Sequence, residues 1–232
     1  MNTSKFRTFF FFILIVLGLI TPVLHAQDHF RMSAEFTIKS KSPDGTQHLT
    51  IGDVFYDKNI KKIVFDVRFP QKETWVQQDT ILYKVKNGAL LSKSSSINIS
   101  DFTIFSMALS GKLSDYGLKG SKFVLTNVEK ERDNMISTWE PPQAYKKFMG
   151  KVMIMKNDDN ISGVIFFDKD GYIISRQFFR KYENINGMLF PTEVIVEKNI
   201  NGEKFYDITT YENVKVDDYK NEDKYDYKIP TP

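Results

Sequence analysis

The feature that most constrains the fold is an alternation of apolar and polar side chains in the segment from Phe36 to Val85. Within Ile63–Phe69 every second residue is apolar, whereas Asp66 and Arg68 have the opposite phase. A period of two is typical of a β-strand with one buried face and one solvated face. The segment therefore predicts consecutive antiparallel strands. The same period recurs in three neighbouring runs: Phe36 with Ile38, Ile51–Tyr56 and Ile81–Val85.

Short turn sequences divide the rest of the chain into further strands. Asn87-Gly88 is a two-residue hairpin signal, and turns rich in Asn, Asp and Gly recur later at the spacing of an antiparallel meander. About ten to twelve strands are expected, and twist should curl a sheet of that size. We therefore predict a mainly β fold, a curved antiparallel sheet that forms an unclosed half-barrel. The later strands are expected at residues 123–125, 135–139, 151–156, 161–167, 172–182, 190–197 and 205–216, with a last strand at 225–229.

One short segment interrupts the strand pattern. Residues 102–109 are rich in apolar side chains and predict a helix that is capped by Ser100 and ended by Gly111. Because this helix is apolar on nearly all sides, another surface must cover it. We expect it to cover the concave face of the sheet. Side chains alone or a bound ligand could fill the remaining space, and both alternatives stay open at this point.

The chain begins with a predicted leader. Lys5 and Arg7 precede an apolar block, Phe9–Ile20, and a small residue stands at Ala26. This order is typical of a secretory signal peptide, residues 1–26, that is cleaved after Ala26. An uncleaved membrane anchor is the alternative, although the apolar block is shorter than the roughly 20 residues that a membrane span needs. We expect residues 27–232 to form a single domain that is soluble in the periplasm.

Composition excludes several classes of protein. The chain has no cysteine, so it can form no disulfide and carries no lipidated cysteine at the cleavage site. Loss of Lys5 and Arg7 with the leader leaves 30 basic and 29 acidic residues. Acidic and basic residues are interspersed, and no basic cluster is combined with aromatic stacking residues. Nucleic-acid binding is therefore not expected.

The sequence offers little for catalysis or metal binding. His29 and His48 are the two histidines after the leader, and no Gly-x-Ser-x-Gly motif accompanies them. Asp168–Gly171 is similar to the start of a calcium loop, but Phe179 occupies the place of the required glutamate. The segment is more simply interpreted as a turn. We predict no enzyme activity, no catalytic residue, no metal site and no cofactor.

Several short segments lie along the chain in a characteristic order and spacing. They are residues 32–36 (MSAEF), 44–45 (DG), 52–56 (GDVFY), 68–70 (RFP), 79–83 (DTILY), the apolar helix, 123–125 (FVL) and 223–230 (DKYDYKIP). Together they resemble one known family, the LolA-type periplasmic carriers of outer-membrane lipoproteins. The resemblance implies an unclosed antiparallel barrel lidded by helices. It also implies an acylated lipoprotein or lipid as cargo, donor and acceptor proteins at the membranes, and a monomer.

Two departures from the family pattern concern the lid. Carriers of this type open with a helix before the first strand, and only a few residues separate Ala26 from the first strand here. The family also has an arginine at the cavity mouth, after the strand that corresponds to Gly52–Tyr56, where this chain has Lys58. A lysine retains the charge but lacks the planar fork with which arginine binds several carbonyl groups.

Aromatic content bears on whether the half-barrel holds a ligand. The chain has 20 Phe and 11 Tyr, and five of the Phe belong to the leader. These rings could form a close-packed core, or they could line a deformable cavity for acyl chains together with flexible methionines. The resemblance favours a carrier that shields acyl chains during transit; the alternative is a non-transporting sensor or scaffold module that binds lipid or protein. The predicted cavity residues are Phe36, Phe55, Ile63, Phe65, Val67, Trp75, Phe102, Phe105, Met107, Leu109, Met153 and Met155, with Lys58 at the mouth.

Overall fold

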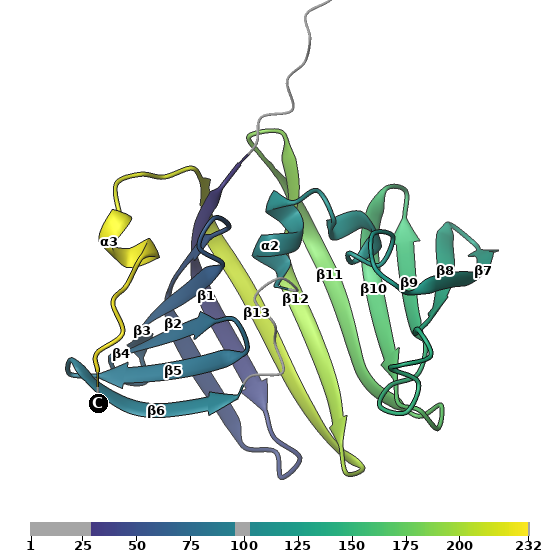
Figure 1. The fold of residues 1–232 in the computed structure, drawn as a ribbon, viewed down its shortest axis with the longest axis horizontal. Coiled ribbons are helices and arrows are strands. Elements are labelled where there is room, and N and C mark those ends of the chain that lie inside the picture. Colours follow the sequence, from purple (N-terminus) through teal and green to yellow (C-terminus); the bar gives the residue numbers. More distant parts are fainter. Residues whose placement is uncertain (1–28, 96–102, 232) are drawn as a thin grey trace, which may run out of the picture.

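A computed structural model describes residues 29–95 and 103–231, and its dominant feature is one antiparallel sheet (Figure 1). Within the described residues the sheet has 13 strands in the order β6-β5-β4-β3-β2-β1-β13-β12-β11-β10-β9-β8-β7. The two edge strands, β6 and β7, do not pair with each other, so the sheet is an open half-barrel. The predicted fold class is confirmed. The strands of the first half are β1 (Arg31–Lys41), β2 (Gln47–Asp57), β3 (Lys62–Phe69), β4 (Glu73–Gln78), β5 (Ile81–Lys86) and β6 (Ala89–Ser95).

The second half of the chain adds strands on the other side of β1. Because β13 pairs with β1, the last strand joins the two meanders into one continuous sheet. The hairpins β11–β12 and β12–β13 are the longest of this half. The strands are β7 (Val124–Glu131), β8 (Asn134–Glu140), β9 (Val152–Asn157), β10 (Asn160–Phe167), β11 (Ile173–Ile185), β12 (Met188–Ile200) and β13 (Glu203–Val216).

Bulges help the sheet to curve. The β2–β3 register shifts between Ile51 and Gly52. A β-carbon at Gly52 would lie 2.3 Å from the carbonyl oxygen of Asp66, so only glycine permits this close approach of the two backbones. A second shift lies between Ser33 and Glu35, where β1 meets β13. Irregularities of this kind bend and twist the strands that contain them.

The helix α2 (Ile104–Leu109) lies on the concave side of the sheet, as predicted (Figure 1). Its predicted start is wrong. Thr103, not Ser100, is the N-cap, and its hydroxyl accepts a hydrogen bond from the backbone N–H of Ser106. Phe102 lies outside the described residues. A short 3-10 helix, η2 (Leu113–Asp115), follows α2 on the same side.

The predicted last strand at residues 225–229 is wrong. The chain instead forms a short helix, α3 (Glu222–Tyr225), and then continues without regular structure. This segment contacts β2 and β3, each of which already pairs with a strand on both sides, so it cannot pair there as a further strand. Apolar and polar residues alternate at 225–229 because the apolar ones pack against the outer side of the sheet. Tyr225 is fully buried there, and Tyr227 and Ile229 are partly buried in the same apolar cluster. Residues 217–231 are called the C-terminal strap below.

The sheet therefore has apolar clusters on both sides. The larger cluster lies between the concave face and α2 and η2, and includes Phe36, Tyr56 and Phe105. The smaller cluster lies between the convex face and the C-terminal strap. Among the residues that the structure describes, no helix is long and apolar enough to cross a membrane.

Candidate functional site

The concave face of the first strands brings together five of the twelve predicted cavity residues. Phe65 is paired with Val54 on one side and with Trp75 on the other, and residues opposite one another share a face of a sheet. The ring of Phe65 meets that of Phe36 edge-on at 5.4 Å between centroids and lies 6.4 Å from that of Trp75. Ile63 and Val67, two positions away, also face this side and are almost completely buried.

The helix α2 fills the middle of the concave side. Phe105 is 1% exposed. Its ring lies 5.2 Å from that of Tyr211 and 5.6 Å from that of Phe190, between centroids. Met107 and Leu109, also predicted cavity residues, are buried in the same cluster. The side chains of α2 therefore fill the middle of the concave face, and α2 is called the plug or the lid below.

Packing beside the plug is less complete. Phe65 and Trp75 are only partly buried, unlike Phe36 and Ile63 on the same face. The Nζ of Lys84 lies 4.8 Å from the centre of the Trp75 ring, and the indole N–H donates to Glu73. The concave face thus changes from a closed core under α2 to a partly exposed aromatic wall toward β4 and β5.

Lys58 connects the sheet to the lid. It lies in the β2–β3 turn, and its Nζ donates a hydrogen bond of 3.2 Å to the carbonyl oxygen of Leu109, the last residue of α2. Carbonyl groups at the end of a helix lack partners within the helix, and a cation there is favourable. The Nζ also lies 5.9 Å from the centre of the Phe30 ring. We call Lys58, with its hydrogen bond to the carbonyl group of Leu109, the latch.

A second covering element was missed by the sequence analysis. The segment after α2 looks polar and rich in turns, but Leu113, Tyr116 and Leu118 are buried over the later strands. The hydroxyl of Tyr116 donates to the side-chain carbonyl of Gln177 at 2.8 Å. Burial raises the pKa of Tyr116 to about 12, although the hydrogen bond to Gln177 opposes the shift. The spacing of the three apolar residues was the available signal.

Three predicted cavity residues lie on the opposite face. Phe55 alternates with the inward-facing Val54 and Tyr56, and its ring meets that of Tyr225 at 5.4 Å in the outer cluster. Met153 and Met155 alternate with Val152 and Ile154, and it is the latter pair that belongs to the concave core. The structure therefore does not bring Phe55, Met153 or Met155 together with the plug.

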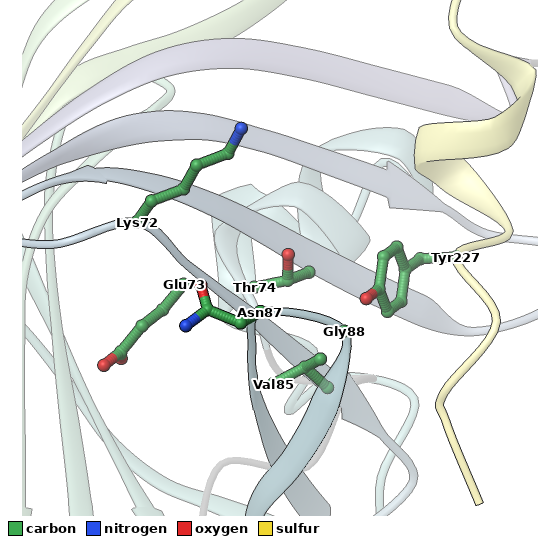
Figure 2. Close-up of a pocket in the computed structure, with 7 residues that line it drawn as sticks. All are labelled: Lys72, Glu73, Thr74, Val85, Asn87, Gly88 and Tyr227. Atoms are coloured by element: carbon green, nitrogen blue, oxygen red, sulfur yellow. The ribbon is translucent and has the colours of Figure 1, made fainter.

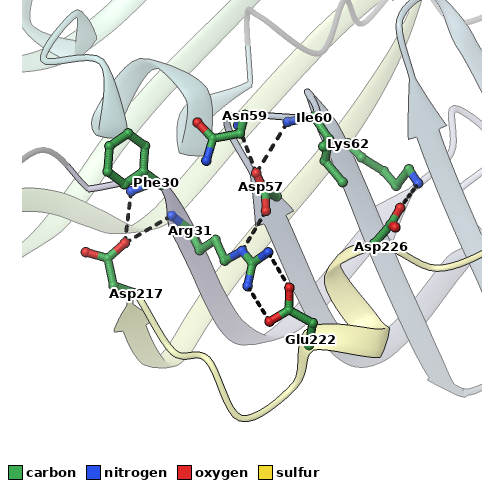
Figure 3. Close-up of polar contacts among 9 residues, drawn as sticks. All are labelled: Phe30, Arg31, Asp57, Asn59, Ile60, Lys62, Asp217, Glu222 and Asp226. Carbon is green, nitrogen blue, oxygen red and sulfur yellow. Dashed lines mark hydrogen bonds and ion pairs between the residues drawn. The ribbon is translucent and has the colours of Figure 1, made fainter.

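Ion pairs fasten the C-terminal strap to the outside of the sheet (Figure 3). Arg31 donates from Nε to Asp57 at 2.6 Å and from Nη2 to Glu222 of α3 at 2.9 Å. The hydrogen bond with Glu222 is the main cause that raises the pKa of Arg31, and the same contact lowers the pKa of Glu222. Asp57 also accepts hydrogen bonds from the backbone N–H groups of Asn59 and Ile60. The strap is thus linked to the turn that carries Lys58.

His29 takes part in the same strap. Its Nδ1 lies 2.7 Å from a carboxylate oxygen of Asp217, whose other oxygen accepts from the backbone N–H groups of Phe30 and Arg31. His48, in contrast, is exposed on β2. The contacts of His29 are those of a structural tie. The described part of the chain contains no group of three or more His, Cys, Asp or Glu side chains that could hold a metal ion.

Two polar grooves border the strap on the convex side. One, of about 290 Å³, lies between the start of β4, the β5–β6 turn and Tyr227 (Figure 2). The other, of about 370 Å³, lies beside α3, and its charged walls include Asp66 and Lys224, which pair at 2.6 Å. Both are lined mainly by polar side chains, so neither suits an acyl chain. The lining of the first groove is Lys72, Glu73, Thr74, Val85, Asn87, Gly88 and Tyr227.

Comparison with known proteins yields similarity at the level of structure. No protein-family model matches the sequence. No curated protein matches it either. A LolA superfamily protein from Nitrosomonas europaea superposes with a TM-score of 0.55 at 15% identity, covering 86% of this chain and 91% of that one. A DUF1329 family protein from Desulfovibrio piger gives a TM-score of 0.61 at 16% identity, covering 87% and 91% of the two chains.

A third solved structure has a similar extent. It is a domain assigned to outer membrane lipoprotein sorting, from Vibrio parahaemolyticus, with a TM-score of 0.58 at 9% identity over 85% of this chain and 89% of that one. In each case the match covers most of both chains, so the similarity concerns the whole half-barrel and not a local hairpin. The protein therefore has the fold of the LolA superfamily and of lipoprotein-sorting domains, and the resemblance predicted from its sequence is confirmed at the level of the fold.

Proposed function

We propose that this protein is a periplasmic carrier that shields the acyl chains of an outer-membrane lipoprotein or lipid on the concave side of its half-barrel. The observation that carries the proposal is the lid. An apolar helix, α2, occupies the middle of the concave face, and the Nζ of Lys58 donates a hydrogen bond to the carbonyl oxygen of its last residue, Leu109. The similarity to a lipoprotein-sorting domain supports the same class of cargo.

Binding would proceed by exchange of apolar side chains for cargo. Each buried methylene contributes about 0.8 kcal/mol, so a cargo with several dozen methylenes in a preformed empty cavity would not be released. In this half-barrel the cargo must first displace Phe105, Met107 and Leu109, which are buried on the same surface. Their burial competes with the burial of the cargo. The competition lowers the net affinity and makes transfer to an acceptor protein feasible without covalent chemistry.

The leader is part of the proposal. Cleavage after Ala26 would release residues 27–232 into the periplasm as one soluble domain. N-terminal sequencing of the exported protein is expected to begin at Gln27. Recovery of full-length protein in the membrane fraction would contradict both the cleavage and the soluble location.

The decisive experiment is native mass spectrometry of the protein isolated from its own periplasm in the absence of detergent. A carrier is expected to retain acylated cargo, and the delipidated protein should bind a fluorescent fatty-acid probe. A sensor or scaffold that binds only protein should be recovered bare and should not bind the probe. Donor and acceptor proteins could then be sought by crosslinking of the loaded form.

A further inference from the structure

The connection between β8 and β9, residues 141–151, is an ordered platform at one end of the sheet. Pro141 is buried at its start, and Met149 packs against the main core near its end. The backbone N–H of Tyr145 donates to the carbonyl of Pro142 at 2.8 Å, and that of Phe148 to the carbonyl of Tyr145 at 2.8 Å. The side chains between the two anchors are therefore held outward by a fixed backbone.

Three aromatic side chains project from this end. Phe148 is 72% exposed and Tyr145 is 47% exposed. The neighbouring β10–β11 turn adds Tyr172, which is also 72% exposed. The two segments are in contact because the backbone N–H of Gly150 donates to the carbonyl of Phe167 at 2.9 Å (Figure 1). We call Tyr145, Phe148 and Tyr172 the aromatic tip.

The β10–β11 turn is as well fixed as the platform. A carboxylate oxygen of Asp168 accepts from the backbone N–H groups of Asp170 and Tyr172 at 2.9 and 2.8 Å. A β-carbon at Gly150 would lie 2.0 Å from the carbonyl oxygen of Asp168, so the two backbones pass too closely for any larger residue. These contacts fix the backbone that carries the exposed side chain of Tyr172.

The segments that carry the aromatic tip have an excess of basic residues, because residues 141–151 and 168–172 together hold four lysines and two acidic residues, Asp168 and Asp170. Residues 141–151 contain three lysines, Lys146, Lys147 and Lys151, and no acidic residue. The Nζ of Lys147 lies 4.7 Å from the centre of the Phe148 ring. The β9–β10 turn at the opposite end of the sheet has the reverse character, with Asp158 and Asp159 and no lysine. The turn at one end of β9 and β10 is thus acidic, whereas the segments at the other end carry a net positive charge.

We infer that the aromatic tip is a docking surface for the anionic headgroup layer of a lipid bilayer. Exposed Phe and Tyr beside lysines are the combination that enters a membrane interface, where rings occupy the headgroup level and ammonium groups meet lipid phosphates. Protein interfaces also use aromatic residues, but they are depleted in lysine. The inference goes beyond acyl-chain binding, since it needs no cargo. It would bring the protein to a membrane surface with a defined orientation.

Vesicle binding tests the inference directly. The protein is expected to sediment with vesicles of phosphatidylglycerol and phosphatidylethanolamine but not with vesicles of pure phosphatidylcholine. The double variant Lys146→Glu with Lys147→Glu should lower the partition coefficient at least about 25-fold, because each lysine near an anionic surface contributes about fivefold. Phe148→Ser with Tyr172→Ser should also weaken binding. The matched controls Lys130→Glu, exposed on β7, and Leu91→Ser, 59% exposed on β6, should bind as the parent does.

A single-cysteine label reports the orientation, because the chain has no cysteine of its own. An environment-sensitive dye at Phe148→Cys is expected to shift to the blue on anionic vesicles, whereas the dye at Asp159→Cys should not. Equal shifts at both positions, or sedimentation that the tip variants leave unchanged, would overturn the inference. So would a tip-dependent dimer, or tip-dependent binding to another protein, without vesicle binding. Binding of the fatty-acid probe is measured on the same variants and should stay unchanged, so failure here is distinguishable from failure of the carrier proposal.

Discussion

The variant Phe65→Ala tests whether the concave face near Phe65 binds cargo or is an ordinary hydrophobic core. The ring stands on the concave face between Phe36 and Trp75, with centroid distances of 5.4 and 6.4 Å, and is only partly buried. Phe36 on β1, which is separated from β3 by β2, is 1% exposed and is the matched control. Phe36→Ala should destabilise the protein by about 3 to 5 kcal/mol, the usual loss for a fully packed ring. Phe65→Ala should cost roughly half as much, about 2 kcal/mol, since fewer contacts are lost.

The two variants are compared by urea denaturation and by titration with a fluorescent fatty-acid probe. If the aromatic wall of Phe65 and Trp75 contacts cargo, Phe65→Ala should weaken probe binding by more than its modest effect on stability would suggest. An equal loss of stability for both variants, with probe binding unchanged by Phe65→Ala, would refute the reasoning. It would show that Phe65 is a core residue and that the cargo, if any, lies elsewhere.

Two further predictions concern the C-terminal strap. Arg31→Met should lower the free energy of unfolding, measured by urea titration, by about 3 kcal/mol. The reason is that the carboxylate of Asp57, whose side chain is 2% exposed, loses its charged partner. The control Arg68→Met, which removes a half-exposed arginine, should cost under about 1 kcal/mol in the same titration. Hydrogen bonds from Lys228 and Lys62 lower the pKa of Asp226 to about 2, and one from Arg31 lowers that of Glu222. Both carboxyl groups have lower pKa values in the folded state than in the unfolded state, so their contribution to stability is present above about pH 4 and is lost as the pH falls toward 2. The urea midpoint of unfolding should therefore fall over this pH range. Asp226→Asn should make the fall smaller.

The sequence predicted the strands well because the period of two survives wherever one face is wet. Ile63, Phe65 and Val67 were placed correctly, since Asp66 and Arg68 mark the solvated phase of β3. The helix α2 was found because the apolar segment at residues 102–109 interrupts the alternating strand pattern. Turn residues then separated most of the strands, but β4 was not predicted, and β7 extends six residues beyond the predicted end at residue 125.

Face assignment failed where both phases of a strand are apolar. Residues 152–155 read Val-Met-Ile-Met, so alternation alone cannot say which pair points inward. The choice of Met153 and Met155 rested on their flexibility, whereas the register of β8, β9 and β10 turns Val152 and Ile154 inward. Phe55 was misplaced for a related reason, because the outer face of β2 is also buried, under Tyr225 of the strap. The sequence of β2 itself gives no sign that a distant segment, the C-terminal strap, buries its outer face.

Two adjacent residues at the β2–β3 turn, Asp57 and Lys58, make contacts on opposite sides of the sheet. Asp57 is fixed on the outside by Arg31 and by two backbone N–H groups of its own turn, and Lys58 reaches the lid on the inside. The latch is therefore a preorganised donor on a rigid turn, but it has one ammonium group where an arginine would have a fork of donors. Lys58→Arg should hold α2 more firmly, and Lys58→Met, which keeps the length and removes the charge, should free it.

The measurement for Lys58 is the association rate of the fatty-acid probe by stopped flow. In the proposed mechanism the lid opens before the probe enters, so Lys58→Met should bind the probe faster than the parent and Lys58→Arg more slowly. The loss of one hydrogen bond to a charged donor, about 1.5 to 3 kcal/mol, corresponds to roughly a 10- to 150-fold change in the population of the open lid. The control is Lys130→Met on the exposed strand β7, which should leave the rate unchanged. Identical association rates for all four proteins would show that the contact between Lys58 and Leu109 does not gate the concave face.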